Sequence, residues 1–339
     1  MLSAVRSALR KKLKMAVRRV SLRLDLAQDF FYDLRRFAAH SATLGRELSA
    51  EQARNYIRML SHSLEKGLAL PRPRAGFGKK KAADLIGRIS NYLEKHGDHS
   101  EISDSICVLL EYCTASFLSM NDTAELIGLM QSGGLSSTGN VEKAVATRTM
   151  TAEEIILATN FDAEMFFRSR SSVRQFGEGS VNEDVLLRAI QMAQLCPSVC
   201  NRQSARVHIF RNGPETAKIL EHQHGNSGFG SDASHILLIT SELGAFFSSE
   251  ERYQAWIDGG MFAMSLIYAL HANRVASCCL NWSSSRNRDV AMRRSARIPA
   301  SETIIMLMAV GNYREHFTVA GSPRKSLSDV VSMHGGAGE

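Results

Sequence analysis

Two short polar segments, separated by one amphipathic helix, limit the folds open to this chain. The first is RSSVRQF, residues 170–176, and the second is CPSVCNRQ, residues 196–203. Arginine offers a planar, permanently charged fork and serine adds hydroxyl donors, so the first segment suits a phosphate dianion. The amides of the second segment both donate and accept hydrogen bonds, which suits the polar edge of a flat heterocycle. The ordered pair predicts a site for a mononucleotide-type cofactor.

These segments resemble the pattern of the nitroreductase family of FMN flavoproteins, R-R-S-x-R-x-F followed by P-S-x-x-N-x-Q, with Ser171 at the second arginine of the pattern. The resemblance covers about residues 160–331 and implies an α+β fold. It implies a mixed sheet flanked by helices, in a homodimer that binds FMN at its interface. The residues implied to contact the phosphate, ribityl chain and pyrimidine edge are Arg170, Ser171, Ser172 and Arg174. Those implied to line the isoalloxazine from the partner subunit are Pro197, Ser198, Asn201 and Gln203.

Two later segments match further parts of the family pattern. Asn281 and Trp282 follow an expected strand at 277–280, where the family contacts the flavin ring. The segment 322–327, SPRKSL, resembles a P-R-x-x-L element that returns a basic side chain to the phosphate, so Arg324 and Lys325 complete the expected set.

The implied chemistry is hydride transfer from NAD(P)H through flavin N5 to a small organic acceptor, such as a nitroaromatic or a quinone. No catalytic side chain is expected, because the cofactor carries the reaction. Residues 228–233 match a dinucleotide fingerprint by letters only, since they precede a strand instead of following one. Donor and acceptor are therefore expected to use one open ring face in turn, with ping-pong kinetics. A non-catalytic scaffold and an oxygen-dependent tailoring oxidase remain as alternatives.

Charge is unevenly distributed over the 339 residues. Residues 1–100 contain 21 Lys and Arg against 9 Asp and Glu, whereas the remainder contains 20 against 25. Residues 1–24 hold eight basic residues, no acid and an apolar residue at every third or fourth position. This pattern is typical of a helix on an anionic membrane surface, of a mitochondrial presequence, or of a helix packed on its own domain. No nucleic-acid partner is expected.

Helical periodicity predicts an all-α N-terminal domain over residues 1–140, followed by the FMN-binding domain over 141–339. The boundary is placed in the Gly- and Ser-rich segment 131–140. Ser49 with Gln52 predicts a capping box, and Gly67 predicts a helix C-cap. Helices are expected at 25–44, 49–68, 84–95, 101–118, 183–195 and 258–271, the last buried all round and at the dimer seam. Strands are expected at 206–211, 235–240, 277–280 and 303–310.

Cysteine and histidine usage argues against disulfides and metals. The six cysteines form no C-x-x-C pair, and no secretory segment precedes them, which predicts reduced thiols in the cytoplasm, with peripheral membrane contact as an alternative. The run 261–270 is too short to span a bilayer. His62 and Glu65 share a helix face and are expected to form a hydrogen-bonded pair, not a metal site.

Overall fold

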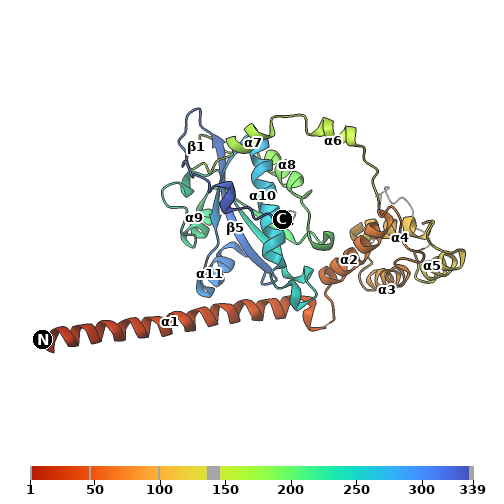
Figure 1. Ribbon diagram of the computed structural model, residues 1–339, viewed down its shortest axis with the longest axis horizontal. Helices are drawn as coiled ribbons and strands as arrows, with labels where there is room; N and C mark the ends of the chain where they lie inside the picture. The colour runs from red at the N-terminus through yellow and green to blue at the C-terminus, as the bar shows by residue number, and fades with distance from the viewer. Residues whose placement is uncertain (1, 46, 98–99, 136–145, 336–339) are drawn as a thin grey trace.

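The computed structural model describes residues 2–45, 47–97, 100–135 and 146–335, with residues 2–10 described by their backbone alone. A sheet-containing domain lies between a long projecting helix, α1, and a compact group of helices, α2 to α5 (Figure 1). The predicted domain boundary at residue 140 lies outside the described residues. The division into residues 1–140 and 141–339 therefore stays a prediction.

The N-terminal part is helical, as predicted. Ser49 and Gln52 form the expected capping box at the start of α2, where the serine hydroxyl accepts from the Gln52 amide at 3.2 Å. Leu64, Leu85 and Leu109 are fully buried and join three of the helices in one core. The helices are α1 (Leu2–His40), α2 (Ala50–Leu68), α3 (Lys79–His96), α4 (Ser103–Cys113) and α5 (Met120–Ser132).

The prediction that Gly67 caps α2 is wrong, because α2 continues through it to Leu68. A Cβ at Gly67 would lie 2.0 Å from the ring of Phe77, so glycine is needed here for close packing. The chain reverses instead at Gly78, whose φ of +79° favours glycine and which precedes α3. Lys79 to Lys81 form the first turn of α3, before the start expected at residue 84.

One five-stranded sheet forms the centre of the C-terminal part. Its longest strand, β5, pairs with β3 on one side and with β4 on the other, so that Val310 is the partner of both His235 and Ser277. A mixed sheet was expected, and each pairing in the described residues is antiparallel. The strands are β1 (Phe176–Gly177), β2 (Ala205–Arg211), β3 (His235–Glu242), β4 (Val275–Asn281) and β5 (Glu302–Tyr313).

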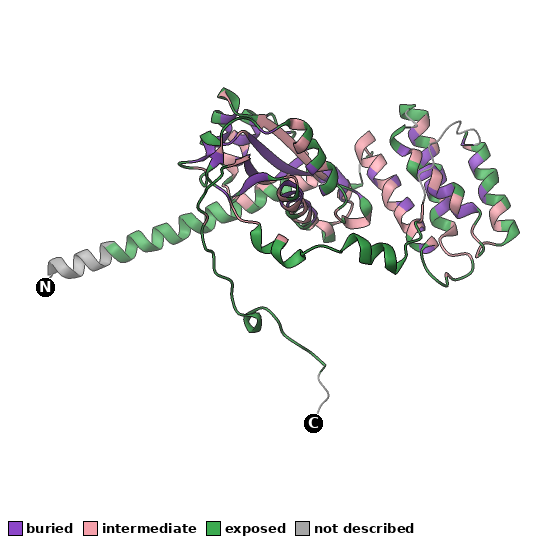
Figure 2. Ribbon diagram, turned by 90° about the horizontal axis from the view of Figure 1, so that it is seen from above, coloured by how far each residue is buried: buried purple, intermediate pink, exposed green. Residues whose placement is uncertain are grey.

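Helices cover both faces of this sheet, which confirms the α+β class. Successive side chains of a strand point to opposite faces, so Leu237 packs with α8 and α10 whereas Ile236 and Leu238 pack with α9 and α11. Figure 2 shows the buried strands between these layers. The helices are α6 (Ala152–Ala158), α7 (Ala163–Ser169), α8 (Glu183–Ala193), α9 (Pro214–Glu221), α10 (Gln254–Ala272) and α11 (Arg286–Ala296).

Helix α10 is less buried than expected. Phe262 and Leu266 lie in the core, but Trp256, Ile257 and Met264 on the same helix are exposed. The largely apolar sequence of α10 therefore supplies a core face and a second, exposed face.

The C-terminal end of α1 docks on the sheet domain. The Tyr32 hydroxyl donates to Asp289 at 2.7 Å, and Arg36 donates to the Glu302 carbonyl at 2.6 Å. The rest of α1 projects away from the body (Figures 1 and 2), and the Leu13 and Val17 side chains are more than 60% exposed. Among the described helices, none is long and apolar enough to cross a membrane.

Candidate functional site

An open cavity of about 870 Å³ collects most of the residues predicted to bind the phosphate. We call it the arginine cavity. The segment after α7 contributes Arg170, Ser171, Ser172 and Arg174, and the C-terminal segment contributes Arg324. The first segment is fixed against β4, because the Val173 amide donates to the Ser277 carbonyl at 2.9 Å. Two segments from opposite ends of the sheet domain thus meet at one site.

The donors of this cavity are largely available to a ligand. Arg170 is half-buried and has no hydrogen bond or ion pair with another described residue. Arg174 lies over the ring of Phe229, 5.7 Å from its centroid. Arg168, which the sequence interpretation did not include, also lines the cavity but is paired with Glu164 at 2.6 Å. The remaining guanidinium and hydroxyl donors fit an anion with several acceptor oxygens.

Burial and the charge of Arg170 both act on a neighbouring histidine, His271. Burial lowers the pKa of His271, and the Arg170 guanidinium lowers it further, so the imidazole is neutral at neutral pH. Its ring nitrogens contact the Ser169 hydroxyl at 2.8 Å and the Tyr313 hydroxyl at 3.2 Å. His271 therefore adds polar contacts beside the cavity without a competing positive charge.

The segment 197–203, which we call the amide loop, is held by a buried arginine. Arg202 is fully enclosed, donates to the Ala245 carbonyl at 2.6 Å and forms a bidentate ion pair with Glu251. The rings of Phe246 and Phe247 lie 5.6 and 5.5 Å from its guanidinium. Arg202 is a structural anchor, because its side chain has no exposed surface with which to meet a ligand.

The backbone of the amide loop is unusual. Cys200, Asn201 and Gln203 all have φ near +50°, a region that residues with a Cβ rarely occupy. The loop is stabilised by Asp258, which accepts from the Val199 amide at 3.2 Å, and by Ser198, which accepts from the Gln203 amide at 3.0 Å. Strained backbone held by surrounding bonds is common at binding sites.

The structure does not bring all twelve predicted residues into one cavity. Ser198 and Gln203 line a second cavity, and Pro197 and Asn201 line neither of the two. Asn281 and Trp282 lie at the end of β4 as predicted, but the Trp282 indole donates to Asp289 at 2.9 Å and so supports the docking of α1. Lys325 is exposed and lies outside the arginine cavity.

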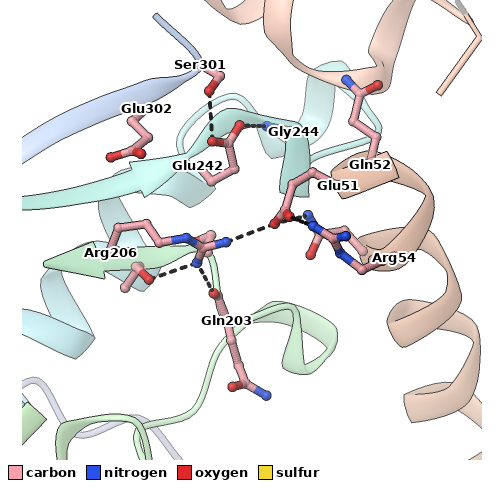
Figure 3. Close-up of polar contacts among 12 residues, drawn as sticks. Glu51, Gln52, Arg54, Gln203, Arg206, Glu242, Gly244, Ser301 and Glu302 are labelled. Atoms are coloured by element: carbon pink, nitrogen blue, oxygen red, sulfur yellow. Dashed lines mark hydrogen bonds and ion pairs between the residues drawn. The ribbon is translucent and has the colours of Figure 1, made fainter. Parts of the chain in front are cut away.

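The helical domain contacts the amide loop through a chain of polar groups (Figure 3). Arg206 at the start of β2 donates to the Gln203 carbonyl at 3.0 Å and to Glu51 of α2 at 2.8 Å. Glu51 also accepts from Arg54 of the same helix. The ring of Tyr56 meets that of Phe247 edge to face at 5.2 Å. The N-terminal helices are thus part of the surroundings of the candidate site.

The sequence interpretation missed Arg202, Asp258 and His271. Arg202 lies inside the second motif, and its side chain is buried there, where it anchors the amide loop. Asp258 and His271 stand in an apolar helix, where polar residues signal a specific partner. Elsewhere, His62 and Glu65 form the predicted pair at 2.9 Å, and no group of three potential metal ligands occurs in the described part of the chain.

Comparison with known proteins identifies the sheet domain. Residues 167–312 match the model of the nitroreductase family. No curated protein matches the chain. Among solved structures, a putative nitroreductase in complex with FMN from Desulfovibrio desulfuricans is 17% identical, with a TM-score of 0.45, and covers 53% of this chain and 100% of its own. The putative nitroreductase ydfN from Bacillus subtilis is 14% identical, with a TM-score of 0.45, covering 50% of this chain and 98% of its own.

The family model ends at residue 312, before Arg324, and begins after the helical region. The predicted family motifs at 170–176 and 196–203 both lie inside the match. Over residues 167–312 the chain therefore carries a nitroreductase-family domain.

Proposed function

We propose that this protein is an FMN-dependent oxidoreductase that transfers electrons from NAD(P)H to a small organic acceptor, such as a quinone or a nitroaromatic. The observation that carries this proposal is the arginine cavity in a nitroreductase-family domain. Arg170, Arg174 and Arg324 line it together with three serines, although Arg324 lies far away in the sequence. That donor set fits the phosphate of a mononucleotide.

Each group of residues has a separate task in this proposal. Arg170 and Arg324 hold the phosphate, and Ser171 and Ser172 add hydroxyl donors. Arg174 and Asn201 would stabilise negative charge that develops at the pyrimidine edge, since preorganised donors stabilise charge that develops during a reaction. Bound FMN would supply the two-electron redox chemistry. The protein supplies binding, orientation and electrostatics.

We further propose that the protein is a homodimer. Within one chain, Ser198 and Gln203 line a different cavity from Arg170, which supports a site completed by a second copy. Exposed apolar side chains also surround the sheet domain at α6, α7 and α10, where a monomer would leave a large uncovered apolar surface. Examples are Leu157, Met165, Phe167, Trp256 and Ile257.

Steady-state kinetics test the proposed reaction. Because donor and acceptor share one open face, double-reciprocal lines should be parallel when NADH or NADPH and a quinone are varied together. Intersecting lines would contradict a shared face. Bound flavin without turnover of either nicotinamide would favour the scaffold alternative, and oxygen-dependent product formation without nicotinamide would favour the oxidase.

A second proposal concerns α1. We propose that its free part binds the surface of an anionic membrane. Residues 11–24 carry six Lys and Arg and no acid, and their leucine and valine side chains are exposed because nothing in the described chain covers them. Such a helix can bury apolar side chains among lipid headgroups while its cations meet anionic lipid.

A further inference from the structure

A second cavity lies where the helical domain meets the amide loop. We call it the junction cavity. It measures about 470 Å³, which is in the range of sites for small organic molecules. Arg54 and Arg58 of α2 form one wall, and Ser198 and Gln203 of the amide loop line the same space. Helices from outside the family match thus take part in it.

Part of the cavity wall outside α2 is apolar. Leu187 and Ile190 come from α8, Val207 and Ile209 from β2, and Phe262 from α10. A flat hydrocarbon ring can bury its faces against such side chains, which removes apolar surface from water. The cavity therefore suits a ligand with an apolar ring at one end and a polar group at the other.

Most charged groups of the junction cavity already have partners. Arg54 donates to Glu51 and, at 3.2 Å, to the Tyr92 hydroxyl, and it lies 3.6 Å from Glu101. Arg206 is bonded to Glu51 and to the Gln203 carbonyl. The bond between Arg206 and Glu51 joins the helical region to the sheet domain, and none of these groups is available to a ligand without loss of its bonds.

Arg58 differs from the other two arginines. It is half-buried at the cavity wall, and among the described residues no hydrogen bond or ion pair reaches it. Its charge acts on Glu51 only at longer range: burial opposes ionisation of that carboxyl, but Arg54, Arg206 and Arg58 hold its pKa below the ordinary value. A guanidinium carries five donors, and no acceptor among the described residues engages those of the Arg58 side chain, so they are free to meet a ligand. An acceptor anion would satisfy them.

We propose that the junction cavity binds a small aromatic carboxylate, with the ring against Leu187 and Phe262 and the carboxylate on Arg58. The further assignment of this ligand as the electron acceptor rests on the proposed flavin function, because the amide loop lines the same cavity. Binding of the ligand does not depend on that function. The helical domain would then select acidic acceptors over neutral ones.

Calorimetric titration of the full-length protein with two matched probes tests this site. 4-Nitrobenzoate and 4-nitrobenzyl alcohol have the same ring, and only the first carries a charge. The wild-type protein should bind the carboxylate at least tenfold more tightly. Arg58→Gln should remove that preference and leave binding of the alcohol unchanged. Arg58→Lys should retain part of it, because lysine keeps the charge without the fork.

Arg72→Gln is the matched control, because Arg72 is exposed in the loop after α2 and does not line the cavity. It should bind both probes as the wild type does. Equal wild-type affinity for the two probes would overturn the proposal even if Arg58→Gln failed to fold. A carboxylate preference that survives in folded Arg58→Gln would overturn it as well.

Turnover separates this inference from the proposed function. Carboxylate binding through Arg58 without any reduction of 4-nitrobenzoate by NAD(P)H would contradict the reductase function and leave the site intact. Reduction of both probes with identical kinetics in wild type and Arg58→Gln would support the function and contradict the assignment of the bound carboxylate as the electron acceptor.

Discussion

The buried guanidinium of Arg202 and the carboxylate of Glu251 form a bidentate ion pair behind the amide loop. The Arg202 side chain has no exposed surface, so its removal leaves Glu251 without its main partner and opens a gap beneath the loop. Breaking a buried pair typically costs about 3–5 kcal/mol. We expect Arg202→Met to lower the free energy of unfolding by that amount and to weaken FMN binding through displacement of Asn201.

Urea unfolding and FMN titration measure these two effects. Arg252→Met is a suitable control, because Arg252 is exposed and stacks on Tyr253. If Arg202→Met matched this control in both stability and FMN affinity, the loop would not depend on the buried pair.

Arg170 and Arg324 come from the two segments that form the arginine cavity, and both are expected to contribute to FMN binding. Arg170→Ala and Arg324→Ala should each weaken FMN binding at least tenfold with the fold intact, since a charge-assisted hydrogen bond contributes about 1.5–3 kcal/mol. Fluorescence quenching on titration with FMN gives the affinity. Arg294→Ala, at an exposed position of α11 outside the cavity, should bind FMN normally. Normal affinity in both cavity variants would remove the phosphate assignment.

The lowered pKa of Asp289 predicts how the stability of the protein depends on pH. Burial alone would raise its pKa, but Arg293, Trp282 and Tyr32 more than offset this and hold the pKa below the ordinary value. The unfolded chain therefore binds the proton more readily than the folded one. The stabilisation is fully present above about pH 4 and is lost as pH falls through the lower folded value.

We expect Asp289→Asn to be less stable by roughly 3 kcal/mol at neutral pH, because Arg293 loses a buried partner. Its stability should also fall less steeply than that of the wild type below pH 4. Thermal unfolding at several pH values measures the slope, and Asp232→Asn, at an exposed position, should keep the wild-type slope. If stability fell with pH equally steeply in Asp289→Asn and in the wild type, the lowered pKa of Asp289 would be contradicted.

The projecting part of α1 predicts lipid binding that depends on charge. The full-length protein should sediment with vesicles that contain phosphatidylserine. It should stay in the supernatant with vesicles of pure phosphatidylcholine. Each basic residue near an anionic surface contributes about 1 kcal/mol, and salt screens this attraction. Removal of residues 1–24 should abolish sedimentation. Binding that ignores lipid charge, salt and this truncation would exclude the membrane role.

Local patterns were sufficient to predict much of the fold. Helical spacing located most helices, β2 to β5 overlap the four expected strands, and Ser49 with Gln52 marked the start of α2. The packing role of Gly67 could not be predicted in the same way, because Phe77 contacts it only after the chain has folded back on α2. The sheet register likewise depends on pairings between distant strands.

The candidate site was predicted in part for a similar reason. The RSSVR segment and Arg324 could be assigned from their motifs, and both line the arginine cavity. The contact between Glu51 and Arg206 joins the helical region to the sheet domain, and neither residue lies in a motif that indicates its partner. Long-range contacts of this kind depend on how the two domains pack, which local sequence does not encode.

Anaerobic titration of the FMN-loaded protein with NADH and with NADPH tests the central claim most directly. The account predicts that at least one nicotinamide bleaches the visible absorption of the bound flavin, and that a quinone restores it. A protein that binds FMN but keeps its full absorption with excess of both nicotinamides would contradict the proposed oxidoreductase.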